Sequence, residues 1–337
     1  MKWIAIDIGN SEIKVAVRGL NNKPAKLLYD NHGQKYSHLP SESYHIDEDY
    51  FYIGYYISII GALYPDRIID IKDKIKNEVL IKTLLDKIKQ AAVFHYNDTS
   101  IGSLILYDDN KYNDYEPMIK IAELLFDDVK QVCSSEVLWS SKCKKLKNVM
   151  VIDITMSSLK VSYIENGIKT AYFLNKDLGF SSVDISQLIG YIPSNNSSMI
   201  ELFLQGFFVE KARMDLCQGC MEDLLLEVLN IHNKDLSKIK AMFEDQMMKY
   251  LFKCFDICGQ NLKKISKTWD DINGVIFCGG AANYHRLAET YNLYLNNNGF
   301  DVDKNNIITY NKDAQWAAVN AAVKQDYDVN LDFDIEF

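Results

Sequence analysis

The hydrophobic pattern near the start of the chain predicts a β-hairpin. Residues 3–8 are apolar apart from Asp7, residues 9–12 have the composition of a turn, and apolar and polar residues alternate over 13–17. A continuous apolar run is typical of a buried strand, and alternation is typical of a strand with one buried face. We therefore expect two antiparallel strands joined by a tight turn, with the Asp7 carboxylate at the mouth of the hairpin.

The same pattern returns over residues 150–163, which predicts an internal duplication. Asp153 lies 146 residues after Asp7, close to half the chain length of 337 residues. The matched pairs are Asp7 with Asp153, Ser11 with Ser157 and Lys14 with Lys160. Solenoid repeats have periods of roughly 20 to 50 residues, so a repeat this long indicates two duplicated α/β lobes. The alternative is a coincidence between two common strand-turn-strand patterns.

Further elements follow from the same periodicities. Strands are expected at 25–29, 44–56 (several short ones), 101–107, 129–133, 148–153, 159–164, 169–174 and 274–278. Helices are expected at 78–92, at 116–126, three or four times between 197 and 267 with the longest at 236–265, and at 284–295. The predicted boundaries are a first lobe at 1–147 with a small subdomain at about 31–77, a second lobe at 148–325 with a helical subdomain at about 185–267, and an acidic tail at 326–337.

Composition and charge narrow the class of protein. The hydrophobic fraction of 48% over 337 residues is sufficient for two packed domains. The formal net charge of −9 disfavours binding to nucleic acid or to an anionic membrane surface. The chain shows no signal peptide and no apolar run of membrane-spanning length, so we expect a soluble, cytoplasmic protein.

The seven cysteines allow two interpretations. An odd number of scattered cysteines suits free thiols in a reducing compartment. Cys217 and Cys220, together with Cys254 and Cys258, also have the residue count of a zinc site, although their spacing is loose. Because Cys254 and Cys258 are one turn apart in an amphipathic helix, they also suit a buried position as small hydrophobic residues.

Several segments together resemble a known superfamily. Residues 7–11, Asp-Ile-Gly-Asn-Ser, resemble a first phosphate loop of the form Asp-x-Gly-Thr-Thr. Residues 178–184 are similar to Leu-Gly-Gly-Glu-Asp-Phe-Asp, and residues 277–283 are similar to the adenosine-binding Val-Gly-Gly-Ser-Thr-Arg. The order of these motifs resembles the actin, sugar-kinase and heat-shock chaperone superfamily. It is most similar to the nucleotide-binding domain of the seventy-kilodalton (DnaK-like) chaperones, without their peptide-binding domain.

The resemblance implies a fold and a ligand. The fold would be the two-lobed actin-like ATPase (ribonuclease H-like) fold, in which each lobe is a mixed five-stranded sheet with helices and small inserted subdomains. The ligand would be ATP or ADP with Mg²⁺ in the cleft between the lobes.

The resemblance also assigns roles to particular residues. The catalytic residues would be Asp7, Lys72, Glu136 and Asp153, of which Asp7 and Asp153 would hold the metal. The nucleotide-binding residues would be Gly9, Asn10, Ser11, Lys14, Thr155, Ser157, Ser158, Gly279, Gly280, Ala281 and Asn283.

The chain departs from the family pattern at positions that would bind phosphate and adenine. The second phosphate loop of the family is Asp-x-Gly-Gly-Gly-Thr, whereas residues 153–158 here contain no glycine. Glycine lets backbone amides approach a phosphate without a Cβ in the way. In addition, Lys160 replaces an acidic residue, and Asn283 replaces the arginine that stacks on adenine. We therefore expect ATP hydrolysis to be weak or absent.

Three functions follow from these observations. The first is a chaperone-like protein that binds an adenine nucleotide and acts as a nucleotide-dependent switch or scaffold. The alternatives are an actin-like ATPase that forms filaments, and a small-molecule kinase of the same superfamily, which Lys14 favours. Residues 329–337 alternate apolar and mostly acidic residues, so this tail is expected either to pair with a sheet edge of this protein or a partner, or to be a disordered acidic end.

Overall fold

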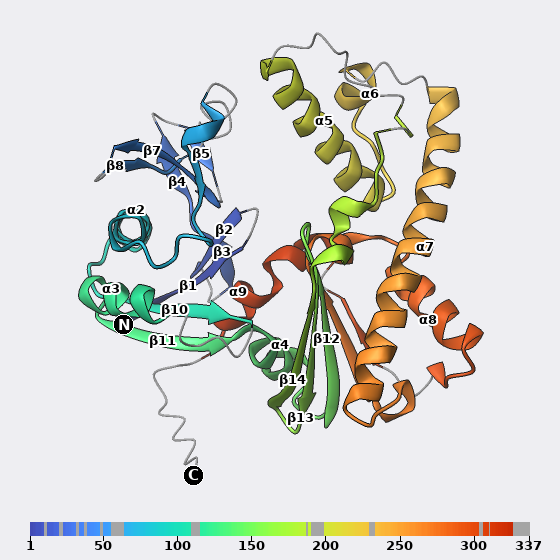
Figure 1. Cartoon of the computed structure of the whole chain (residues 1–337). Helices are drawn as coiled ribbons and strands as arrows, with labels where there is room; N and C mark the ends of the chain where they lie inside the picture. The colour runs from blue at the N-terminus through green and yellow to red at the C-terminus, as the bar shows by residue number, and fades with distance from the viewer. Residues whose placement is uncertain are drawn as a thin grey trace. The chain divides into compact units, whose positions relative to one another are not determined.

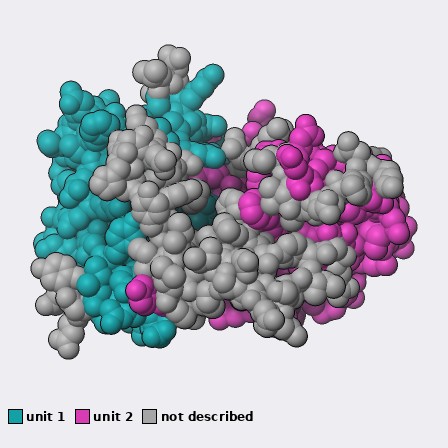
Figure 2. Space-filling view, turned by 90° about the horizontal axis from the view of Figure 1, so that it is seen from above, with its two compact units in different colours: residues 1–57, 66–141, 318–337 teal, residues 58–65, 142–317 magenta. Residues whose placement is uncertain are grey.

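The computed structural model describes residues 1–9, 12–19, 23–31, 34–36, 39–47, 50–54, 64–108, 115–186, 188–189, 199–228, 233–302, 306–309 and 311–325. These residues form a mixed α/β protein (Figure 1). The chain divides into two compact units, which Figure 2 shows in two colours. Unit 1 contains residues 1–57, 66–141 and those from 318 onward, and unit 2 contains residues 58–65 and 142–317.

Unit 1 is built on a mixed sheet whose strand order is β11-β10-β1-β2-β3. Its strands are β11 (Asp128–Cys133), β10 (Ile101–Tyr107), β1 (Lys2–Ile8), β2 (Glu12–Arg18) and β3 (Pro24–Lys26), and β6 (Leu39–Pro40) also pairs with β2. Two smaller sheets join β4 (Tyr29–Asn31) to β5 (Gln34–Tyr36), and β8 (Tyr50–Tyr52) to β7 (Glu42–Asp47) and β9 (Ile68–Asp70). The helices are α2 (Glu78–Tyr96), α3 (Glu116–Leu125), α4 (Ser134–Lys142) and α9 (Ala317–Ala322), the last of which begins at the end of unit 2.

Unit 2 is built on a second mixed sheet, of order β14-β13-β12-β15-β16. Its strands are β14 (Ile168–Asn175), β13 (Leu159–Glu165), β12 (Asn148–Ile154), β15 (Gly274–Cys278) and β16 (Asn306–Ile308). The helices are α5 (Met199–Cys217), α6 (Asp223–Val228), α7 (Asn233–Lys264) and α8 (Leu287–Asn297). Short 3₁₀ turns occur at Lys176–Leu178, Phe180–Ser182, Trp269–Asp271, Gly280–Asn283 and Asn311–Trp316.

The two sheets repeat one another strand for strand. In unit 1, the central strand β1 is antiparallel to β2 and parallel to β10, and β10 is parallel to β11. In unit 2, the central strand β12 is antiparallel to β13 and parallel to β15, and β15 is parallel to β16. The hairpins also share one register, because Asp7 lies opposite Lys14 and Asp153 lies opposite Lys160. Both predicted hairpins are confirmed, and the sequence repeat is thus a structural repeat.

Each sheet buries the same face of its central strand. Ile4, Ile6 and Ile8 of β1 are buried in one core cluster with apolar residues of α2. The equivalent positions of β12 are Met150, Ile152 and Ile154, and they belong to a cluster with apolar residues of α7 and α8. Side chains two apart share a face of a strand, so these three positions of each strand face the same cluster, and Ala5 and Val151 on the opposite face are buried as well.

Helix α2 has clear start and stop signals. The Asn77 side chain accepts a hydrogen bond from the Leu80 backbone N–H (3.0 Å), as an N-cap residue does. The helix ends at Tyr96, and its C-cap residue Asn97 has the left-handed conformation with φ of 49°. The predicted helix ended at residue 92, one turn too early.

Other boundaries also differ from the sequence prediction. Helix α4 was not predicted, because Ser134–Lys142 carries serines on both sides of a short apolar stretch and has little periodicity. Strand β16 was not predicted either. The predicted helix at 284–295 begins at Leu287, since Gly280–Asn283 forms a 3₁₀ turn.

The segment after residue 317 belongs to unit 1, whereas the predicted boundary assigned residues up to 325 to the second lobe. The Arg18 side chain holds this segment by donating from Nε to the Val323 carbonyl (2.7 Å) and from its terminal nitrogen to the Gln325 carbonyl. Periodicity within a segment does not reveal a contact across some 300 residues, so the sequence did not indicate this boundary.

Tyr96 gives unit 1 a stability that depends on pH. Its hydroxyl accepts from the Arg18 backbone N–H (2.7 Å) and donates to the Trp3 carbonyl (2.9 Å), and burial raises its pKa from 10.0 to about 12. A phenol with a raised pKa stabilises the fold fully below pH 10 and loses that contribution as pH rises toward 12. We expect the free energy of unfolding of the wild type to fall more steeply over this range than that of Tyr96→Phe. Urea unfolding at pH 8, 10 and 11 measures this, and parallel curves would contradict the assignment.

Candidate functional site

In each unit, several of the predicted site residues lie at or beside the carboxyl ends of parallel strands. In open α/β sheets, ligands bind outside these ends. In unit 1 the strands that end at this edge are β1, β10 and β11, and in unit 2 they are β12, β15 and β16.

The first hairpin places one lysine between two acids. The Gly9 N–H donates to the Glu12 carbonyl (3.1 Å), and a Cβ on Gly9 would lie 2.8 Å from that oxygen, so this tight turn requires glycine. Lys14 Nζ lies 4.0 Å from Asp7 Oδ2 and 3.5 Å from Glu12 Oε1. The cluster therefore carries a net charge of −1. The predicted ligands Asn10 and Ser11 lie outside the described residues.

The second hairpin has the same turn but closes it with a side chain. The Thr155 N–H donates to the Ser158 carbonyl (2.9 Å), as the Gly9 N–H does to the Glu12 carbonyl. The Thr155 hydroxyl oxygen also accepts from the Ser158 N–H (3.1 Å), and the two hydroxyls are 3.1 Å apart. In a glycine-rich phosphate loop, such backbone N–H groups are available to a ligand. Here the Ser158 N–H is already bonded to the Thr155 side chain of the same loop. Ser157 is the remaining predicted ligand of this loop.

The charge at the second hairpin differs from that at the first. Lys160 Nζ lies 3.4 Å from Asp153 Oδ2, a closer approach than that of Lys14 to Asp7. Ser158 occupies the position that Glu12 has in the first hairpin, so the second acid is absent. The pair formed by Asp153 and Lys160 is therefore neutral.

The strand β15 leads into a glycine turn that touches Asp153. Gly279 has φ of +85°, and a Cβ there would lie 2.4 Å from the Ile154 carbonyl oxygen and 2.5 Å from Asp153 Oδ1. At Gly280 the nearest atom to an added Cβ would be a Phe180 ring carbon at 3.9 Å. The structure thus brings the Gly279 turn, predicted to bind nucleotide, into direct contact with the predicted acid Asp153.

The turn after Gly279 contains a buried amide with an unused acceptor. Ala281 is fully buried, and Asn283 is only 7% exposed. Among the described residues, the Asn283 Oδ1 atom has no hydrogen-bond partner. Buried polar atoms in folded proteins are nearly always paired, so this oxygen is suited to accept from an N–H or O–H group of a ligand.

A second segment supports the 155–158 loop from outside. The Phe180 N–H donates to the Thr155 carbonyl (2.8 Å), and the Ser181 N–H donates to the Met156 carbonyl (3.0 Å). A Cβ on Gly179 would lie 2.3 Å from the Met156 carbonyl oxygen. The predicted segment 178–184 therefore packs directly on the second phosphate loop.

Sequence reasoning missed Arg213, which holds that segment in place. This buried residue of α5 donates from a terminal nitrogen to the Phe180 carbonyl (2.8 Å), and its guanidinium lies 5.5 Å from the centre of the Phe180 ring. Its Nε lies 3.3 Å from Glu210 Oε2. Burial raises the pKa of Glu210, and the charge of Arg213 opposes that shift. An arginine within a mostly apolar helix was the available signal.

Lys72 lies on a turn that follows β9 and adjoins the first hairpin. The Ile71 N–H donates to the Ser41 carbonyl (2.8 Å). Ser41 follows Pro40, which pairs with Glu12 of β2. The fold thus brings the Lys72 turn to the strand that carries Lys14.

Glu136 lies in the first turn of α4, which begins directly after β11. The Ser134 hydroxyl donates to the Tyr107 carbonyl at the end of β10 (3.2 Å), which ties the start of α4 to the neighbouring strand. Glu136 is therefore at the same edge of the sheet as Asp7.

The residues at these edges fit a magnesium ion poorly. Each predicted metal ligand, Asp7 and Asp153, already has a lysine ammonium within 4.0 Å. A Mg²⁺ bound about 5 Å from an ammonium meets a repulsion of about 7 kcal/mol at an effective dielectric constant of about 20. Within the described parts of the chain, no group of three or more His, Cys, Asp or Glu side chains could hold a metal ion without a ligand's help.

The four cysteines of the zinc interpretation also form no metal site among the described residues. Cys217, Cys254 and Cys258 are buried free thiols, whereas Cys220 is exposed, and all four are described. Burial raises the pKa of Cys254 to about 12, and zinc binds the thiolate. The zinc interpretation therefore finds no support in this part of the structure, and the buried cysteines suit the hydrophobic interpretation.

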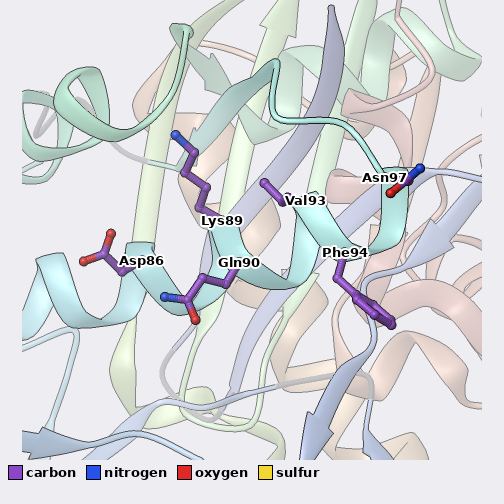
Figure 3. A pocket seen from close by; sticks show the side chains of 6 residues that line it. All are labelled: Asp86, Lys89, Gln90, Val93, Phe94 and Asn97. Atoms are coloured by element: carbon purple, nitrogen blue, oxygen red, sulfur yellow. The ribbon is translucent and has the colours of Figure 1, made fainter.

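A hollow of about 480 Å³ lies along α2, and its lining residues are none of the predicted site residues. Figure 3 shows that the side chains lining it project from successive turns of that one helix. They belong to Asp86, Lys89, Gln90, Val93, Phe94 and Asn97. Phe94 is 78% exposed. None of the predicted catalytic or nucleotide-binding residues lines this hollow, so the hollow is not the candidate site.

Comparison with known proteins adds no assignment. No protein-family model matches the chain, and no curated protein sequence matches it. None of the described helices has the length and apolar character that a membrane span requires. The function must therefore be inferred from the geometry of the two strand edges.

Proposed function

We propose that the chain binds an adenine nucleotide at the carboxyl ends of its central strands and hydrolyses it slowly or not at all. The observation that carries the proposal is the repeated hairpin, which presents an acid-lysine pair at the same position of both sheets. Two sheets of this order are also what the actin-like, two-lobed fold requires, and we include that fold in the proposal. A chaperone-like role as a switch or scaffold stays a prediction of the resemblance.

The phosphate end of the ligand would meet a lysine and hydroxyl groups. Lys160 and the Thr155–Ser158 loop lie beside Gly279, where the backbone is closest to Asp153. Lysine serves as a compact positive charge with three donors.

The base end would meet the buried amide of Asn283. Its unpaired Oδ1 accepts hydrogen bonds only, so it matches the exocyclic amino group of adenine and opposes the carbonyl that guanine has at the same position. This match favours an adenine nucleotide over a guanine nucleotide.

Slow hydrolysis follows from the second loop. Thr155 and Ser158 bond to one another, so the loop presents fewer amides to stabilise charge that develops on a transferred phosphoryl group. Removing one such donor typically lowers the rate of catalysis by a factor of roughly 10² to 10³.

Calorimetric titration of the full chain tests the proposal. We expect saturable binding of ATP and ADP, and binding of GTP that is about tenfold weaker because an acceptor would face Asn283 Oδ1. Asn283→Ala should remove most of the difference between ATP and GTP, whereas Asn297→Ala, which changes an exposed residue of α8, should retain it. Absence of binding of both adenine nucleotides would sink the proposal.

A further inference from the structure

We propose that Lys87 is a site of covalent acylation by small activated acyl donors of the acyl phosphate class. The residue lies on α2, and its side chain is half-buried. Lys87 is none of the predicted site residues, so this chemistry is independent of nucleotide binding. The partners of its ammonium, the burial of its side chain and the product that the reaction leaves all favour this residue.

The Lys87 ammonium is bonded to a neutral group rather than to an acid. Its Nζ donates to the carbonyl of Ile53 (2.9 Å), which lies 34 residues earlier in the chain. Among the residues that the structure describes, no carboxylate forms an ion pair with it. The positions three and four residues away are its neighbours on the helix surface, and none of them is an acid. They are Thr83, Leu84, Gln90 and Ala91.

Burial makes this lysine a better nucleophile than its exposure suggests. Loss of contact with water disfavours a charged ammonium, and burial lowers the pKa of Lys87. Only the neutral amine has the lone pair that attacks an acyl carbon, so a lysine with a lowered pKa is reactive at neutral pH. Lys120 is the opposite case, because its side chain is 69% exposed and the hydrogen bond and charge of Glu116 raise its pKa. Access and charge state therefore rank these two lysines in opposite orders.

The reaction balances without an oxidant or a further reactant. The ammonium first loses a proton to solvent, and the amine nitrogen then attacks the acyl carbon. A C–N bond forms, the C–O bond to phosphate breaks, and inorganic phosphate leaves with the electron pair of that bond. A second proton leaves the nitrogen for solvent, and the product is a neutral amide.

The product suits the contact that Lys87 makes. A secondary amide keeps one N–H that can donate to the Ile53 carbonyl, and it removes the charge that burial disfavours. Lys211 provides a contrast, since its ammonium pairs with the buried Asp215 and with Glu222. Acylation at Lys211 would leave a buried carboxylate without its cation. Lys87 is therefore a lysine at which the fold tolerates the modification.

Treatment of the full chain with acetyl phosphate at neutral pH tests the proposal, with peptide mass spectrometry as the readout. We expect the rate constant for acetylation of Lys87 to be about threefold higher than that of Lys120, although Lys120 is more exposed. In denaturing urea the preference should disappear, because burial and the ion pair with Glu116 are lost. A faster reaction at Lys120 in the native protein, or a preference that persists in urea, would overturn the proposal.

A charge placed beside Lys87 separates the effect of protonation from that of access. Thr83→Glu adds a carboxylate four residues before Lys87, the spacing at which a glutamate pairs best with a lysine. Acetylation of Lys87 should then slow about threefold, whereas Thr83→Gln, which is similar in shape but uncharged, should retain the wild-type rate. Lys120 should keep its wild-type rate in both variants, and thermal unfolding checks that both are folded. Equal rates at Lys87 in the two folded variants would also overturn the proposal.

Discussion

Gly279→Ala is expected to lower the free energy of unfolding by at least about 3 kcal/mol. Two costs add at this position. The backbone has φ of +85°, which L-residues rarely adopt, and the new Cβ would lie 2.4 Å from the Ile154 carbonyl oxygen and 2.5 Å from Asp153 Oδ1. Neither obstacle is the flexible end of a long side chain, so β12 or β15 must shift to relieve the contact.

Two other glycines of unit 2 provide the controls. Gly299 also has positive φ, at +75°, but no atom lies within 4 Å of an added Cβ, so Gly299→Ala measures the backbone strain alone, about 1 kcal/mol. Gly280 has only a ring carbon at 3.9 Å, and Gly280→Ala should cost less than about 0.5 kcal/mol. Urea denaturation of the three variants measures the differences. An equal loss for Gly279→Ala and Gly299→Ala would show that the close approach to Asp153 is not maintained in solution.

The sequence was sufficient to predict the two hairpins because their information is local. Alternation and apolar runs set the strands, and the repeat at 146 residues predicted that Asp7 and Asp153 take equivalent positions, as the identical registers confirm.

The parts that the sequence did not predict depend on distant contacts. Arg213 reaches the Phe180 carbonyl 33 residues away in the sequence, and Arg18 reaches the Val323 carbonyl 305 residues away. No periodicity within a segment encodes such partners. The hydrogen bond from the Ser158 N–H to the Thr155 hydroxyl was missed for another reason. The sequence shows that the glycines of this loop are absent, but it does not show that a threonine side chain accepts the hydrogen bond that a ligand would accept.

These contacts connect the helical part of unit 2 to the candidate site. Arg213 on α5 holds Phe180, and Phe180 in turn holds the carbonyl of Thr155. The conformation of the 155–158 loop therefore depends on a helix that contributes no residue to the predicted site. Removing the arginine should affect both the stability and the loop.

Arg213→Met is expected to lower the free energy of unfolding by about 3 kcal/mol. Methionine keeps the apolar volume but loses the charge-assisted hydrogen bond to the Phe180 carbonyl and leaves Glu210 without its cation. Because Arg213 opposes the upward shift in the pKa of Glu210, that pKa should rise further in the variant. A carboxyl with a raised pKa destabilises the fold as pH rises through it, so the loss should be larger at pH 7 than at pH 4.5.

The matched control for this prediction is Arg286→Met, because Arg286 is also an arginine paired with acids, here Glu244 and Glu289, but is 47% exposed. Exposed ion pairs contribute roughly 0 to 1 kcal/mol, so the control should fall in that range. Urea unfolding at both pH values measures the stabilities, and hydrogen exchange at the amides of Phe180 and Ser181 reports on the loop. Faster exchange at these amides in Arg213→Met, but not in Arg286→Met, is expected because the carbonyls they bond to belong to the 155–158 loop. Unchanged exchange together with a loss below about 1 kcal/mol would mean that α5 does not hold the loop, and that the second hairpin sets its own conformation through Thr155 alone.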